Sequence, residues 1–214
     1  MASRRSAKTR TAKRVRRARP ARRAAAGDSE GRIVEAALDL AARQGWRRTG
    51  LGEIAAGAGL SLAELHGRLR SRGAILMACM RYFDRLTLTG AEDASGTPRE
   101  KLFELLMRRF DALKPHRKAI AAMCRDSIGD PAALLGFKGL MISMGWMLEA
   151  AGVPTAGLPG RARRKLLALV YLSVLVVFVR DESDDLAKTM ATLDRRLGMA
   201  ESWLGLGAPS GPAQ

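Results

Sequence analysis

Between Gly50 and Leu76 the sequence predicts two short helices separated by a tight turn. In the first of them, apolar residues recur at helical spacing, at Leu51, Ile54, Ala55 and Ala58. Gly59 can then adopt the left-handed conformation that ends a helix. Ser61 can cap a second helix, and Glu64, three residues later, completes a capping box. The chain therefore has to turn sharply from one short helix into another within a few residues.

Two short helices that cross through a turn of about three to four residues containing glycine form a helix-turn-helix. The second helix of this motif can enter the major groove of DNA. Leu65 and Leu69 are spaced to face back onto the first helix, so we expect them to be buried. The residues that we expect to meet DNA are Thr49, Ser61, Leu62, Ala63, Glu64, His66, Arg68 and Arg72.

The expected roles of these residues differ. Arg68 and Arg72 would hold phosphates, His66 could donate to one, and free N–H groups near Ser61 would attract another. Leu62 and Ala63 offer only apolar contact with thymine methyl groups, which is weak readout. The alternative is a three-helix folding unit that does not read DNA.

A longer stretch, from Ile33 to Leu76, resembles the amino-terminal domain of the TetR-type regulators. The matching residues are Ile33, Ala36, Ala37, Leu38, Leu40, Gly45, Trp46, Thr49, Leu51, Ile54, Ala55, Ala58, Gly59, Leu60, Ser61, Leu65, Ser71 and Leu76. The sequence departs from the family at His66 and Leu69, where aromatic residues are usual. The resemblance implies an all-α chain of about nine helices, with a helix-turn-helix domain followed by a helical ligand-binding and dimerisation domain. It also implies a homodimer that binds double-stranded DNA as a transcriptional regulator, most often a repressor.

Composition and charge divide the chain. Its 214 residues are 47% hydrophobic, enough for one or two domains with a real core. The formal net charge is +16, of which residues 1–27 supply +11 without any acid, leaving +5 for the rest. We therefore expect a disordered basic tail at 1–27 and a flexible end at 206–214. Between them, the TetR resemblance implies a DNA-binding domain at 28–78 and a ligand-binding and dimerisation domain at 79–205. The tail could add phosphate contacts, be merely solvated, or serve as an organelle-targeting presequence.

The last two predicted helices fit a dimer interface. Residues 166–179 are apolar all round but too few to span a bilayer, so we expect a buried helix and no integral membrane segment. Ser183 can cap a final helix that carries Asp184 and Asp185 in its first turn. The TetR resemblance implies that this pair forms a four-helix bundle with the partner copy, through Leu169, Leu172, Val176, Leu186, Met190, Leu193 and Leu197.

A second resemblance leaves another function open. Residues 181–185, Thr189 and residues 193–196 are similar to the tail of the ubiquinone-biosynthesis accessory proteins. These are lipid binders with a TetR-like fold. The resemblance implies, as the alternative, a protein that holds an isoprenoid or quinone lipid and no longer reads DNA.

A cluster of methionines in the middle helices predicts an apolar pocket. Because methionine adapts to irregular shapes, a small-molecule or lipid ligand could bind there, although such a cluster can equally be plain core. The expected pocket residues are Phe110, Met141, Met144, Trp146 and Met147.

Signs of catalysis are weak. The only histidines are His66 and His116, and no local spacing places a nucleophile beside a base or a pair of carboxylates. Cys79 and Cys124 each lie in an apolar helical pattern, which suggests neither a disulfide framework nor a metal site. We therefore expect a cytoplasmic protein that is not an enzyme and needs no cofactor or metal.

Overall fold

The computed structural model describes residues 29–91, 95–131 and 133–206, and these residues are helical with connecting turns. A first helix occupies residues 29–44. The further elements are α2 (Leu51–Gly57), α3 (Leu62–Arg68), α4 (Arg72–Leu88), α5 (Pro98–Leu113), the 3₁₀ turn η2 (Lys114–His116), α6 (Arg117–Asp126), α7 (Ala133–Ala150), α8 (Gly157–Phe178) and α9 (Ala187–Leu204). The all-α prediction is confirmed. The expected tail at 1–27 lies outside the described residues, as do residues 207–214 of the expected flexible end.

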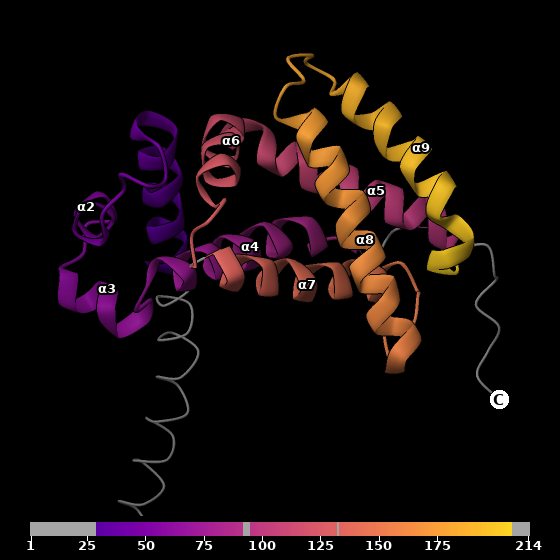
Figure 1. Ribbon diagram of the computed structural model, residues 1–214, viewed down its shortest axis with the longest axis horizontal. Coiled ribbons are helices and arrows are strands. Elements are labelled where there is room, and N and C mark those ends of the chain that lie inside the picture. Colours follow the sequence, from indigo (N-terminus) through magenta and orange to yellow (C-terminus); the bar gives the residue numbers. More distant parts are fainter. Residues whose placement is uncertain (1–28, 92–94, 132, 207–214) are drawn as a thin grey trace, which may run out of the picture.

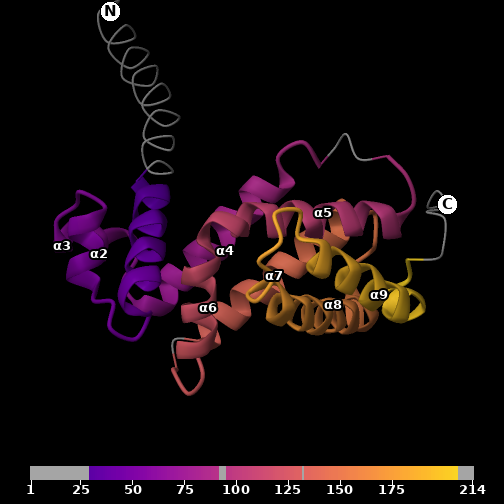
Figure 2. The same cartoon turned by 90° about the horizontal axis from the view of Figure 1, so that it is seen from above.

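The helices form a small unit at one end and a larger helical body at the other (Figure 1). The first helix packs with α2 and α3, while α8 and α9 lie at the opposite end, as the view from above also shows (Figure 2). Between them α4 runs alongside α7, with which it makes its most extensive contact. Residue 78 lies in the middle of α4, so this helix belongs to both expected domains.

Local signals in the sequence correctly place the starts of α3 and α5. Glu64 accepts hydrogen bonds from the Ser61 N–H (2.8 Å) and hydroxyl (2.9 Å), and the Glu64 N–H donates to Ser61 Oγ (3.2 Å). Thr97 and Glu100 form the same capping box at α5. The turn before α3 includes Gly59 at φ +65°, in the left-handed region that favours glycine.

The final helix begins later than the sequence suggests. It starts at Ala187, so Asp184 and Asp185 lie outside its first turn, contrary to our expectation. Ser183 nevertheless serves the start of this helix as expected, because the Ala187 N–H donates to Ser183 Oγ (3.1 Å) and also to the Asp185 carboxylate (3.1 Å). The Thr189 N–H (2.8 Å) and hydroxyl (2.7 Å) donate to the Asp181 carboxylate. The same carboxylate also accepts from Ser183, which holds the connection between α8 and α9 in place.

The apolar helix α8 is buried on one side only. Leu169 and Val176 are 65% and 55% exposed, whereas Leu167, Val174 and Phe178 are buried against the body. The expectation of burial all round therefore fails for a single copy of the chain. Among the described residues, no helix is both long and apolar enough to cross a bilayer.

Candidate nucleic-acid interface and ligand cavity

The second helix of the helix-turn-helix presents one open face. Leu65 and Leu69 are buried against the rest of the unit, as expected, although Leu69 is the residue that ends α3. The other side chains of α3 are exposed, including Leu62 at 57%. The exposed expected residues are Ser61, Leu62, Ala63, Glu64, His66 and Arg68. Six of the eight expected residues thus lie on one exposed segment.

Glu64 is held by its capping role. Its carboxylate accepts from the main-chain N–H and the hydroxyl of Ser61, and these hydrogen bonds hold the pKa of Glu64 below its usual range. The side chain is thereby tied to the start of α3. A base-reading role for Glu64 would require breaking the capping box.

Thr49 and Arg72 have internal roles instead of facing outward. Thr49 is buried and donates to the Gly45 carbonyl (2.9 Å), which closes the turn after the first helix. The Arg72 guanidinium stacks 4.6 Å over the Trp46 ring and donates to the carbonyls of Trp46 (2.5 Å) and Arg47 (3.0 Å). We therefore correct both assignments, because the Thr49 hydroxyl closes a turn within the unit and Arg72 secures the unit to α4. Arg48 and Arg70, which lie next to α2 and α3, are also exposed. They are not among the residues expected to meet DNA, although their place beside the two helices could be read from the sequence.

A second attachment joins the helix-turn-helix to the end of α6. The Arg47 N–H donates to the Asp126 carboxylate (3.2 Å), and its side chain donates to the carbonyls of Asp126 (3.2 Å) and Ile128 (2.7 Å). The hydrogen bond from the Arg47 main chain, with Arg125 nearby, holds the pKa of Asp126 below its usual range. Sequence reasoning could not find this contact, because its partners are 79 or more residues apart.

The larger body contains an apolar cavity of about 270 Å³. Helices α4 to α8 all contribute to it, and exposed Cys124, Phe137 and Leu172 mark its open side. The lining residues are Leu76, Cys79, Met80, Phe83, Arg109, Leu113, Ile120, Met123, Cys124, Ser127, Ala133, Gly136, Phe137, Leu140, Tyr171, Leu172 and Leu175. Burial raises the pKa of Cys79 to about 12, so its thiol is not a nucleophile.

None of the five expected pocket residues lines this cavity. Met144 and Met147 are fully buried core, Met141 is partly buried, and Trp146 is 58% exposed. Phe110 stacks on Tyr171 with ring centroids 5.3 Å apart. From α7 the cavity is lined by residues at helical spacing on one side of its first turns, among them Gly136 and Leu140. Met144 and Met147 lie further along the helix, and Met141, although adjacent to Leu140, is not on that side.

A buried polar cluster adjoins the cavity. Arg109 donates to the Asp84 carboxylate (2.5 Å) and through Nε to the Tyr171 hydroxyl (3.3 Å). Its Nη2 has the Met80 sulfur at 3.7 Å, and Ser143 also donates to Asp84. The cluster joins α4, α5, α7 and α8 at one point. Burying an ion pair is costly unless it is well hydrogen-bonded, and here Tyr171 and Ser143 supply further hydrogen bonds to it.

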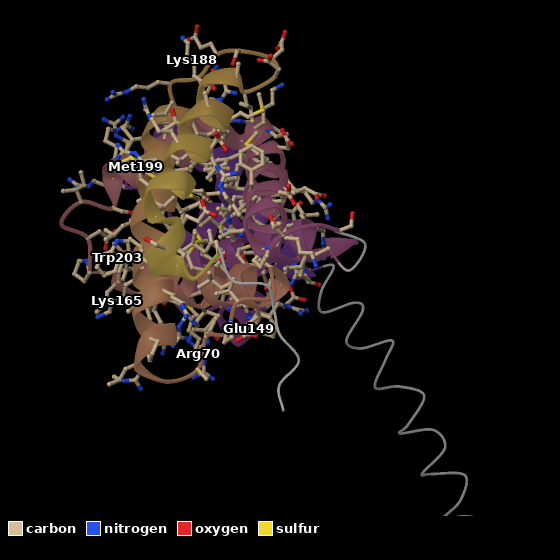
Figure 3. All side chains as sticks on the ribbon, turned by 90° about the vertical axis from the view of Figure 1, so that its right-hand side faces the viewer. Arg70, Glu149, Lys165, Lys188, Met199 and Trp203 are labelled. Atoms are coloured by element: carbon tan, nitrogen blue, oxygen red, sulfur yellow. The ribbon has the colours of Figure 1, made fainter. Side chains whose placement is uncertain are left out.

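The expected dimer residues divide into two groups. Leu186, Leu193 and Leu197 are fully buried within one copy, because they pack α9 onto the body, so we correct their assignment. Leu169, Leu172, Val176 and Met190 are exposed. Further exposed apolar side chains on α9 are Met199 and Trp203, which Figure 3 shows on the same side of that helix.

Comparison with known proteins identifies similar folds. A TetR transcriptional regulator from Nitrosomonas europaea is 27% identical, with a TM-score of 0.65 over 81% of this chain and 98% of that one. A TetR regulator from Rhodococcus sp. RHA1 is 20% identical, with a TM-score of 0.62 over 80% and 94% of the two chains. Thermus thermophilus FadR, a TetR family repressor in complex with lauroyl-CoA, is 22% identical, with a TM-score of 0.51 over 86% and 98%.

Sequence comparisons give less. The COQ9 family model matches residues 161–203, which are most of α8 and α9 with their connection. No curated protein matches the sequence significantly. The chain thus has a TetR-like fold, and its carboxy-terminal part is similar to COQ9.

Proposed function

We propose that this chain, which shares the fold of the TetR regulators, is a ligand-responsive DNA-binding transcriptional regulator that works as a homodimer, most simply as a repressor. In this proposal residues 28–78 bind DNA, and residues 79–205 bind the ligand and pair with a second copy. The tail at 1–27 adds phosphate contacts that do not depend on sequence. The protein acts in the cytoplasm and is not an enzyme.

The observation that carries the proposal is the open face of α3. A short helix that buries only Leu65 and Leu69 leaves its whole outer side available for a groove. His66, Arg68 and Arg70 supply donors along this face and just beyond it, suited to phosphates on either side of the helix. Because Leu62 and Ala63 are the side chains at its start, most of the affinity would come from the phosphate backbone.

Pairing of two copies is supported by the exposed apolar stripe of α8. Leu169, Leu172 and Val176 are spaced three and four residues apart, so they lie on one side of the helix. A two-fold axis through this surface gives each copy the same contacts. Such pairing is the usual way to set two recognition helices about 34–36 Å, or a multiple of that, apart on DNA.

The response to a ligand is supported by how the cavity borders both attachments of the helix-turn-helix. Leu76, Cys79 and Met80 line the cavity from α4, the helix that follows α3 directly. Ser127 lines it from the end of α6, next to the segment that Arg47 contacts. A ligand that favours one spacing of α4 and α6 would favour one orientation of α3, so ligand and operator would be coupled.

The test is binding of the purified protein to its own upstream DNA and to scrambled DNA of equal length, across a salt series. We expect specific binding to survive deletion of residues 1–27 and to weaken in Arg68→Ala. Arg196→Ala, which changes an exposed side chain of α9, is the matched control and should bind like the wild type. Binding that ignores sequence and disappears with the tail would refute the proposal.

A second candidate is a lipid-binding accessory protein that does not read DNA. It is favoured by the match of residues 161–203 to COQ9 and by the apolar character of the cavity. In that case, sequence-specific DNA binding would be absent and an isoprenoid lipid would copurify with the protein. Mass spectrometry of the solvent extract distinguishes this candidate from the first.

A further inference from the structure

Two residues that line the apolar cavity carry hydrogen-bond donors that protein groups do not fully satisfy. Within the described part of the chain, the hydrogen-bond partner of Arg109 Nη2 is the thioether sulfur of Met80, and sulfur is a weak acceptor. The Tyr171 hydroxyl accepts from Arg109 Nε, but among the described residues no acceptor for its own proton lies within hydrogen-bond distance. Both side chains line the cavity and both are buried.

These donors keep their protons. Burial raises the pKa of the Tyr171 hydroxyl, so it remains protonated at neutral pH. For Arg109, burial alone would lower the pKa, but Tyr171 and Asp84 raise it, so the guanidinium remains charged. A buried donor without an acceptor is destabilising, and a ligand oxygen placed between these two would remove that penalty.

The charge of the site is already balanced. The Asp84 carboxylate lies 2.5 Å from Arg109 Nη1 and also accepts from Ser143. A ligand carboxylate at the same guanidinium would leave one negative charge in excess beside apolar walls, which is unfavourable. A neutral oxygen acceptor adds no charge. The Arg109–Asp84 ion pair therefore favours a ligand carbonyl over a ligand carboxylate.

The size of the cavity limits the ligand. An apolar protein cavity of about 150 Å³ binds benzene. In proportion, the cavity of about 270 Å³ accommodates roughly ten to twelve non-hydrogen atoms. Apart from Arg109, Tyr171, Ser127 and the two cysteines, its lining is entirely apolar.

We propose that the ligand of this cavity is an apolar molecule with one neutral carbonyl-type oxygen, which accepts hydrogen bonds from Arg109 Nη2 and the Tyr171 hydroxyl. This inference deepens the proposed function by naming the ligand class, and it rests on the cavity being the ligand site. Asp84, on α4, holds Arg109 for this contact. Asp84 and Arg109 thus connect the ligand oxygen to the helix that carries α3.

The experiment uses three bicyclic probes that stay within this size limit, on the full chain: tetralin, 1-tetralone and indane-1-carboxylate. Isothermal titration calorimetry gives each dissociation constant for the wild type and for Tyr171→Phe, which keeps the ring that stacks on Phe110. Tyr82→Phe is the matched control, because Tyr82 donates to Glu35 outside the cavity. Circular dichroism checks that each variant is folded.

We expect 1-tetralone to bind the wild type about tenfold more tightly than tetralin, the effect of one well-placed hydrogen bond. The difference should shrink in Tyr171→Phe and persist in Tyr82→Phe, and the carboxylate should bind more weakly than the ketone. The double variant Asp84→Asn/Arg109→Met, which removes the pair without leaving a lone charge, should also lose the preference.

Several results would overturn the inference: equal binding of ketone and hydrocarbon, an unchanged preference in Tyr171→Phe, tighter binding of the carboxylate, or no binding of any probe. Because the titration contains no DNA, a negative result would refute the ligand class without refuting the proposed function as a DNA-binding regulator. Ketone binding without sequence-specific DNA binding would retain the ligand class and refute the regulator.

Discussion

Replacement of Asp181 tests how the connection between α8 and α9 is held. The fully buried carboxylate accepts four hydrogen bonds, two from main-chain N–H groups and two from the hydroxyls of Ser183 and Thr189. In Asp181→Ala the buried Thr189 N–H loses its acceptor, which costs about 1–3 kcal/mol, and the other bonds to a charged group are lost with it. Because the hydroxyls can turn to other acceptors, we expect a total loss of about 3 kcal/mol in the free energy of unfolding.

The assay is urea unfolding followed by circular dichroism at fixed protein concentration, since dimerisation would otherwise shift the midpoint. A loss of about 3 kcal/mol corresponds to a fall of roughly 6–12 °C in Tm for a chain of this size. Asp184→Ala is the matched control, because that side chain is exposed, and it should change stability by less than about 0.5 kcal/mol. A loss below about 1 kcal/mol in Asp181→Ala would refute the reasoning.

The pH dependence of this difference has a definite sign. Hydrogen bonds from Ser183 and Thr189 hold the pKa of Asp181 well below its usual range, against the opposing effect of burial. A depressed pKa contributes stability that is fully present above the unfolded value, about 3.9, and is lost as the pH falls towards the folded value. The gap between wild type and Asp181→Ala should therefore be constant from pH 7 to about 5 and narrow below about pH 4. A gap that widens in acid would contradict this.

Three further predictions concern the helix-turn-helix, the dimer surface and the attachment between domains. Gly67→Ala should stabilise the protein by about 1 kcal/mol in thermal unfolding, because an added Cβ there meets nothing within 4 Å and alanine is the better helix former; a destabilised variant would show that α3 is distorted. Leu169→Glu with Val176→Glu should yield monomers in analytical ultracentrifugation, since both exposed side chains lie in the proposed interface, whereas unchanged mass would place the interface elsewhere. Arg47→Ala should leave ligand affinity unchanged but reduce the effect of ligand on DNA affinity about fivefold or more, because it removes the contact with the end of α6. Lys118→Ala, which changes an exposed side chain of α6, should leave that effect unchanged. An equal effect of ligand in both variants would exclude Arg47 from the response.

The sequence predicts well those structural features that depend on residues close together in the chain, such as helix starts. Ser61 with Glu64 and Thr97 with Glu100 each satisfy helix N–H groups within three residues, so the starts of α3 and α5 could be placed from spacing alone. The start of α9 could be placed only in part: Ser183 accepts from the Ala187 N–H, but the Thr189 N–H is satisfied by Asp181, which lies eight residues before it and before an intervening turn. Asp181, Ser183 and Thr189, which belong to the stretch that is similar to lipid-binding proteins, hold the connection between α8 and α9 in this chain.

The candidate sites were harder to predict, because they depend on contacts between distant segments. Basic residues near the recognition helix are alike in sequence, yet Arg68 is exposed while Arg72 is stacked on Trp46. Methionines on α7 suggested a pocket, but the cavity formed where α4 to α8 leave space beside Arg109, a residue that periodicity alone marks as one more core position. Only the packing of whole helices could distinguish these cases.

The two attachments of the helix-turn-helix have a mechanical consequence. One is the covalent passage from α3 into α4, reinforced by Arg72 on Trp46; the other is the contact of Arg47 with Asp126 and Ile128. A rigid body held at two points keeps a single easy motion, rotation about the line that joins them. A shift of α6 relative to α4 would displace one attachment against the other and tilt α3, and in the proposed dimer the two recognition helices would then no longer match the spacing of the DNA turn, while each unit stayed folded.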